Sequence, residues 1–205
     1  RSFQVVAMSY GTLSYSELMR NGEIIRDVVA QSGKKTVIIA SGDMSHALKS
    51  DGPYTYHEDG VSFDQAMCDY TLQQKPYEIL KLDSSTISHA SDCGLRSLTI
   101  LLGCMNHLKI ESELLSYEGP FGVGYLFASY RIIAPSDKDE IKVYDVFHKQ
   151  RMLKERESEH VVVKMARNVI ENFVKECQPP RLSYPRQAVV IQGDKYAGER
   201  SEERR

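Results

Sequence analysis

The fold class of this chain is decided by the stretch Thr36-Val37-Ile38-Ile39-Ala40-Ser41-Gly42-Asp43-Met44-Ser45-His46. Its first part, residues 36–40, is a β-branched run without polar alternation, which is typical of a strand buried on both faces. An earlier apolar run, residues 3–8, predicts another buried strand, and between the two we expect a helix that is capped by Ser14 or Ser16 and ends at Ser32-Gly33. Strand, helix and buried strand in this order predict a layered α/β domain.

Further elements are expected downstream. A long polar stretch covers residues 41–60, and such a stretch inside a compact domain is more often functional than idle. After it the sequence predicts helical segments at 61–73 and 76–82, a loop at 83–90, an apolar helix capped by Ser91-Asp92, and two strands at 110–117 and 123–133.

The composition changes at Pro135. Residues 135–158 are dense in charged side chains, which predicts a solvated linker after a first domain at 1–134. An amphipathic helix is expected within 159–180, followed by a disordered or truncated tail at 181–205. Because the chain lacks an initiating Met and opens inside an apolar run, we expect the first domain to be incomplete at its N-terminus.

The overall composition excludes several classes of protein. With 41% hydrophobic and 26% charged residues, the chain has ordinary globular usage. A net charge of −2 argues against a nucleic-acid binder, and no run approaches the roughly 18 apolar residues that span a bilayer. The four cysteines form no CxxC pair or disulfide framework, so we expect a reduced, cytoplasmic protein.

His46 is the leading candidate for chemistry. It follows the end of a buried strand, and in open α/β sheets sites form in the crevice outside the carboxyl ends of the strands. An imidazole held there can accept or donate a proton near neutral pH. The alternative is a surface histidine that only caps a turn.

Other polar residues lie near it in the sequence. His89 and Cys93 are four residues apart across a loop-to-helix junction, a spacing that suits half of a transition-metal site or a purely structural pair. His57, with Tyr54 in the same loop, either lines a pocket or is ordinary loop polarity.

Four segments, taken in order, resemble the C-terminal half of a Memo-like protein of the class III extradiol dioxygenase (LigB-type) family. Within that family the resemblance is to component B of the AmmeMemoRadiSam system, and it covers about residues 3–134. The segments are Val37 to His46, Asp51-Gly52-Pro53-Tyr54, Asp92-Cys93-Gly94-Leu95-Arg96-Ser97 and Ser116-Tyr117-Glu118-Gly119-Pro120-Phe121-Gly122-Val123-Gly124-Tyr125.

The resemblance implies a layered α/β/α fold with a central, mostly parallel or mixed sheet. It also implies Fe(II) held by two histidines and a carboxylate, with a catecholic small molecule and O2 as substrates. His46 maps to the acid/base histidine, and Cys93 maps to the third metal-ligand position. Apart from the resemblance, we expect Asp43, Tyr54, His57, His89 and Asp92 to line a substrate pocket. The two histidine ligands belong to the N-terminal half of the family domain, which this chain does not contain.

A second resemblance follows the linker. His160 through Val174, ending at Pro179-Pro180, is similar to the opening helix of an AMMECR-type domain. Together the two resemblances imply a radical-SAM protein as a partner. Three functional hypotheses stay open: an extradiol-type dioxygenase domain, a non-enzymatic Memo-like module that binds metal, redox groups or protein, and a structural fragment in which His46 has no role.

Overall fold

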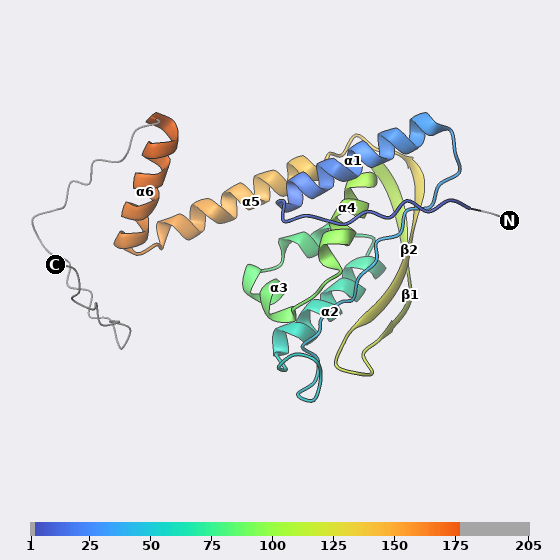
Figure 1. The fold of residues 1–205 in the computed structure, drawn as a ribbon, viewed down its shortest axis with the longest axis horizontal. Helices are drawn as coiled ribbons and strands as arrows, with labels where there is room; N and C mark the ends of the chain where they lie inside the picture. Colours follow the sequence, from blue (N-terminus) through green and yellow to red (C-terminus); the bar gives the residue numbers. More distant parts are fainter. Residues whose placement is uncertain (1–2, 177–205) are drawn as a thin grey trace, which may run out of the picture. The chain divides into compact units, whose positions relative to one another are not determined.

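The computed structural model describes residues 3–176, which fall into two compact units divided between Leu153 and Lys154 (Figure 1). The first unit contains most of the secondary structure and both candidate metal-ligating clusters discussed below. It combines a group of helices with a small sheet, which confirms the predicted α/β class. None of the helices within the described residues is long and apolar enough to cross a membrane.

Helix α1, Tyr15–Ser32, follows its local sequence signals closely. Ser14 is the N-cap and forms a capping box with Glu17, so that two backbone N–H groups at the start of the helix are satisfied. Gly33 ends the helix in the left-handed conformation, at φ 62°, which glycine adopts without strain. The predicted cap and the predicted end of this helix are therefore confirmed.

The next helices carry the loops that meet at the candidate site. They are α2 (Glu58–Leu72), the 3-10 helix η1 (Pro76–Lys81), α3 (Ser84–Ala90) and α4 (Leu95–Cys104). The loop predicted at 83–90 is wrong. Helix α3 covers most of this segment and packs Ile87 and Ala90 against the hydrophobic core. The N-cap residue of α4 is Gly94 and not the predicted Ser91-Asp92, although the Asp92 carboxylate accepts a hydrogen bond from the Leu95 N–H at 2.6 Å.

The sheet consists of an antiparallel hairpin, β1 (Leu108–Glu118) and β2 (Tyr125–Pro135), at the two positions where strands were expected. Helices α1, α2 and α4 gather on one side of it (Figure 1). Between the helices and the hairpin lies a hydrophobic core whose buried members include Met19, Phe63, Ile79, Leu80, Leu95 and Leu102.

Two predicted strands differ from the structure. Residues 3–8 and 36–40 are extended, but neither is paired with a neighbouring strand among residues 3–176, where the sheet has two strands. The predicted parallel pairing is therefore missing from the described part of the chain. Phe3, Val37 and Ile39 are more than 80% exposed, because an extended run is buried on both faces only where strands lie beside it and layers cover it.

The charged stretch 135–158 is more ordered than the predicted linker. Helix α5, Glu140–Glu157, occupies most of it, and Ile141 and Tyr144 at its start belong to the hydrophobic core. In the second unit, helix α6 spans Val161–Glu176, where an amphipathic helix was expected. The predicted tail at 181–205 lies outside the described residues.

Candidate metal centre

The candidate site is built where the loop after residue 40 crosses the loop before α4. Gly42 and Gly94 make this crossing possible, because a Cβ atom on Gly42 would lie 2.5 Å from the Cα of Gly94. Across it the Cys93 N–H donates to the Asp43 carbonyl oxygen at 3.3 Å. The close approach of the two backbones therefore places Asp43 beside Cys93.

The same loop is held on both sides by backbone hydrogen bonds. On one side the His46 N–H donates to the Ala90 carbonyl at 2.9 Å. On the other side, Met44 donates to Gly124 at 2.8 Å, and Gly124 donates back to Ser45 at 2.7 Å. Residues 43–46 thus lie between the end of α3 and the β1–β2 turn.

A buried carboxylate on α2 accepts a hydrogen bond from this loop. Asp64, on α2, accepts the Ser45 N–H at 2.8 Å and the Tyr117 hydroxyl at 2.6 Å. Burial raises the pKa of Asp64 to about 6, and these two hydrogen bonds offset part of that effect. Sequence reasoning missed this pair, since Tyr117 stands in a segment that carries the resemblance but nothing in the sequence connects its hydroxyl group with Asp64.

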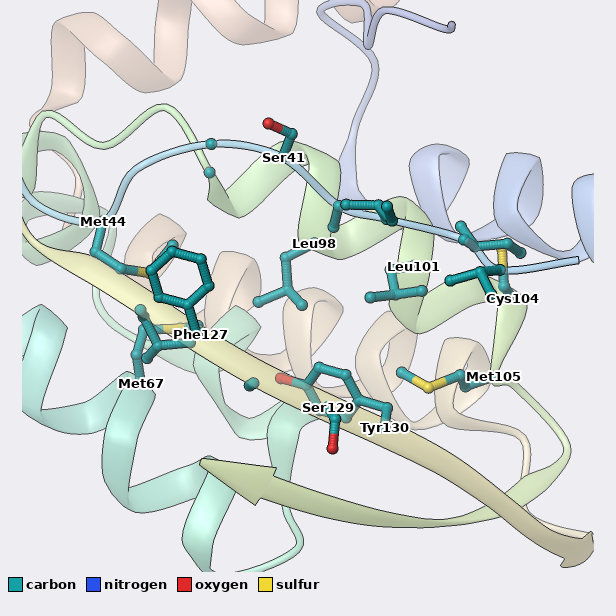
Figure 2. A pocket seen from close by; sticks show the side chains of 18 of the residues that line it. Ser41, Met44, Met67, Leu98, Leu101, Cys104, Met105, Phe127, Ser129 and Tyr130 are labelled. Atoms are coloured by element: carbon teal, nitrogen blue, oxygen red, sulfur yellow. The ribbon is translucent and has the colours of Figure 1, made fainter. Parts of the chain in front are cut away.

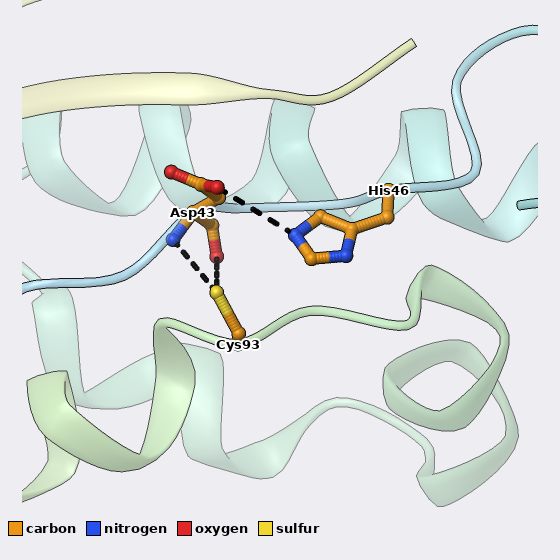
Figure 3. A group of neighbouring side chains, drawn as sticks. All are labelled: Asp43, His46 and Cys93. Atoms are coloured by element: carbon orange, nitrogen blue, oxygen red, sulfur yellow. Dashed lines mark hydrogen bonds and ion pairs between the residues drawn. The ribbon is translucent and has the colours of Figure 1, made fainter. Parts of the chain in front are cut away.

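The His46 imidazole lies in the crossing with one nitrogen unsatisfied (Figure 3). Its Nε2 atom is buried, has no hydrogen-bond partner among the described residues, and lies 3.8 Å from Oδ2 of Asp43. The Tyr54 ring packs against the imidazole, with 5.4 Å between ring centroids. A buried, unpartnered ring nitrogen loses the hydration it would have in water, so it is available to a ligand, a metal ion or a substrate proton.

Cys93 offers a sulfur atom to the same space. Its Sγ accepts a hydrogen bond from the Asp43 N–H at 3.1 Å and lies 3.9 Å from the Asp43 carbonyl oxygen (Figure 3). This N–H orients the sulfur toward the crossing, and cysteine sulfur is an atom that transition metals take as a ligand. One ligand atom from each of Asp43, His46 and Cys93 lies within 4.8 Å of the others.

This donor set fits a transition-metal ion. Imidazole, carboxylate and thiolate are the side chains that bind such ions in proteins, so the cluster offers Cys93 as a ligand and an imidazole that is either a further ligand or an acid/base group. The unsatisfied Nε2 of His46 is the observation that favours a ligand at this place. The set contains one histidine, whereas the non-haem iron triad has two histidines and a carboxylate.

The remaining predicted pocket residues divide into two groups. Tyr54 lies against His46, and Asp92 lies beside Cys93 in the chain, where burial raises the pKa of its carboxyl group. His57 and His89 instead form a separate cluster with Asp59, which sequence reasoning did not single out. The available signal was the spacing of His57 and Asp59, two residues apart at the start of a helix.

A large apolar cavity extends from the crossing (Figure 2). Its volume is about 740 Å³, and it lies between residues 36–44, α4 and β2. Figure 2 shows Leu98, Leu101 and Met105 directed into this space from one side and Phe127 and Tyr130 from the hairpin. Asp43 lines the cavity as well, so this residue is common to the cavity and to the metal-ligating cluster.

The fold and this cluster define the class of protein, an α/β domain with a candidate metal centre in a loop crossing. Residues 1–128 match the family described as the catalytic LigB subunit of aromatic ring-opening dioxygenase, and the chain belongs to this family of class III extradiol-dioxygenase type. Proteins of the family usually bind non-haem iron.

One similar protein is CA_C1420 of Clostridium acetobutylicum, which is 32% identical over 174 residues. The similarity covers 85% of this chain and 37% of that protein, so the chain spans little more than a third of its relative's length.

Proposed function

We propose that this chain supplies the acid/base group and one metal ligand of an extradiol-type, non-haem Fe(II) dioxygenase domain. The observation that carries the proposal is the buried, unpartnered Nε2 of His46 beside the Sγ of Cys93. Bound Fe(II) would supply coordination positions for a catecholic substrate and O2.

In this proposal His46 moves the proton. Its backbone is fixed by the hydrogen bond to Ala90, and its ring is limited by Tyr54, so Nε2 stays directed into the crossing. There it can accept the proton of a substrate hydroxyl group and return it to the product. The Asp43 carboxylate, 3.8 Å from Nε2, would stabilise the imidazolium that forms.

Cys93 takes the ligand role. Its sulfur accepts a hydrogen bond from the Asp43 N–H, and Cys93 lies just before the start of α4. This hydrogen bond keeps the sulfur in place when a metal binds. The cavity beside Asp43 is lined mostly by apolar side chains, with Arg26 among the polar ones, which suits a flat aromatic molecule that carries hydroxyl groups.

A second candidate function is a Memo-like module that binds metal without turnover. Cys93 favours it, because a thiolate selects softer metals and supports redox chemistry where the oxygenase triad uses a carboxylate. On this alternative, α6 would begin an AMMECR-type domain, as the sequence resemblance implies, and the assembly would act with a radical-SAM protein of the AmmeMemoRadiSam system.

Oxygen uptake separates the two functions. The full-length protein would be loaded with Fe(II) under anaerobic conditions and assayed with a panel of catechols. For a dioxygenase, His46→Ala should lower kcat by about 100-fold or more with bound iron unchanged, since an acid/base group contributes about that much. Cys93→Ala should instead lower the bound iron itself.

The control is His160→Ala, an exposed histidine of the second unit, which should leave both iron and kcat unchanged. Iron-loaded wild-type protein that consumes no oxygen with any catechol would overturn the dioxygenase proposal and favour the metal-binding module.

A further inference from the structure

A second group of metal-ligating side chains lies at the junction of α2 and α3. His57 is the N-cap residue of α2, Asp59 lies in the first turn of the same helix, and His89 lies in the last turn of α3. The two imidazole rings are stacked, with 4.0 Å between centroids and 26° between their planes. Three side chains from two helices are thereby brought to one place.

The Asp59 carboxylate lies between the two histidines and faces both. Its Oδ2 atom is 2.6 Å from Nδ1 of His89 and 3.4 Å from Nδ1 of His57. Its other oxygen, Oδ1, is 3.5 Å from the hydroxyl group of Thr86, which can donate to it and keep Oδ2 directed at the rings. The group therefore has an oriented carboxylate and two adjacent ring nitrogens.

The Nδ1 atom of His57 accepts a hydrogen bond from the Asp59 N–H at 3.1 Å, so its lone pair is directed at Asp59 within the cluster. A neutral ring nitrogen is also the form that binds a metal ion. A cation that replaced this capping bond would gain two nitrogen ligands and one oxygen ligand.

We propose that His57, Asp59 and His89 bind a divalent transition-metal ion of the Zn²⁺ class, separately from the cluster of Asp43, His46 and Cys93. One ligand atom from each residue lies within 4.8 Å of the others, and two imidazoles with one carboxylate form a donor set that such ions take. The three side chains are 40%, 27% and 46% exposed, so the ion can enter from solvent and keep water ligands.

The second ion would also steady the first site. The residue after His89 is Ala90, whose carbonyl accepts the His46 N–H, and the His57 N–H donates to the carbonyl of Ala47. Linking His57 to His89 through a metal therefore ties together the two backbone segments that hold His46. We expect the ion to have a positioning role, because its ligands are linked to the His46 segment through these two backbone hydrogen bonds.

Metal stoichiometry tests the proposal independently of the first site. Tag-free protein carrying Cys93→Ser and His46→Ala would be titrated with Zn²⁺ and with Co²⁺ by calorimetry. We expect one bound equivalent, with a Co²⁺ spectrum that lacks thiolate bands, and a rise in Tm with added Zn²⁺. Adding His89→Ala should abolish the binding of this metal equivalent and the rise in Tm. Adding Asp59→Asn should lower the affinity for the metal and reduce the rise in Tm.

The matched control adds His160→Ala to the same background and should keep the bound metal equivalent, because that histidine belongs to neither metal-ligating cluster of the described residues. Circular dichroism of each variant verifies folding, and the three side chains are partly exposed and lie outside the hydrophobic core, so their replacement leaves that core intact. No bound metal in the Cys93→Ser, His46→Ala background would overturn the proposal. A metal equivalent that still binds in the His89→Ala variant and in the Asp59→Asn variant would overturn the proposal too.

Discussion

The two halves of one sequence stretch behave differently in the structure. Residues 36–40 are extended, have no strand partner among residues 3–176, and expose Val37 and Ile39. Residues 43–46, which follow directly, are held by hydrogen bonds on both sides, with Met44 and Ser45 buried. The hydrogen bonds that position His46 and Cys93 therefore come from the surrounding loops and from Asp64 on α2. Among the described residues, strand pairing of residues 36–40 contributes nothing to this arrangement.

The largest expected effect comes from closing the loop crossing. In Gly42→Ala the added Cβ would meet backbone atoms of Gly94 and Cys93 at 2.5 and 2.8 Å, and backbone cannot move aside as a side chain can. We expect a loss of about 3 kcal/mol in the free energy of unfolding, measured by urea denaturation.

Gly11→Ala is the matched control, because a Cβ there would have no atom within 4 Å. It should change stability by less than about 0.5 kcal/mol. Equal stabilities of the two variants would contradict the close approach on which the site depends.

The buried support of the loop gives the next largest effect, and it depends on pH. The pKa of Asp64 is about 6 in the folded protein against an ordinary value of 3.8, so the folded state holds the extra proton between these values. The stabilisation that this proton gives the folded state is therefore fully present below about pH 4 and is lost as the pH rises through 6. The loss amounts to about 2 kcal/mol in the free energy of unfolding.

Asp64→Asn should remove this dependence while keeping an oxygen to accept the Ser45 N–H. The measurement is the difference in unfolding free energy between wild type and variant at pH 4 and at pH 7. The wild type should lose about 2 kcal/mol relative to the variant across that range. A difference that stays constant with pH would show that the carboxyl group titrates normally.

The smallest effect is expected in the unpaired half of the stretch. Replacing both Val37 and Ile39 by Ser should change the stability of this chain by less than about 0.5 kcal/mol, since both side chains are more than 80% exposed. Met44→Ala, in the hydrogen-bonded half, should cost about 2 kcal/mol or more, because Met44 is buried in the core. Thermal and urea unfolding would compare the two, and a larger loss from the Val37 and Ile39 pair would reverse the comparison.

The sequence predicted those helices and strands whose ends and turns depend on residues close to them in the chain. The cap of α1 at Ser14, its end at Gly33 and the β1–β2 hairpin were all readable, since each depends on neighbours in the sequence. Helix α3 was not, because its sequence is polar and its position depends on packing Ile87 against the core.

The site was predicted in part for the same reason. His46 and Cys93 were identified as candidates, and the structure brings them together with Asp43 through a glycine crossing. Asp59 and the pair of Asp64 and Tyr117 were missed, because their partners lie 30 and 53 residues away in the sequence. Contacts at such separations are set by tertiary packing, which periodicity and motifs do not encode.

The most direct test of the account is whether the sulfur of Cys93 binds the metal. Co²⁺ added to the purified protein should give thiolate-to-cobalt charge-transfer absorption in the wild type and in His89→Ala, and this absorption should vanish in Cys93→Ser. Cys68 and Cys104 are buried in the core, and neither lies in a metal-ligating cluster among the described residues. An absent band in the wild type, or an undiminished band in Cys93→Ser, would contradict the assignment of this metal centre.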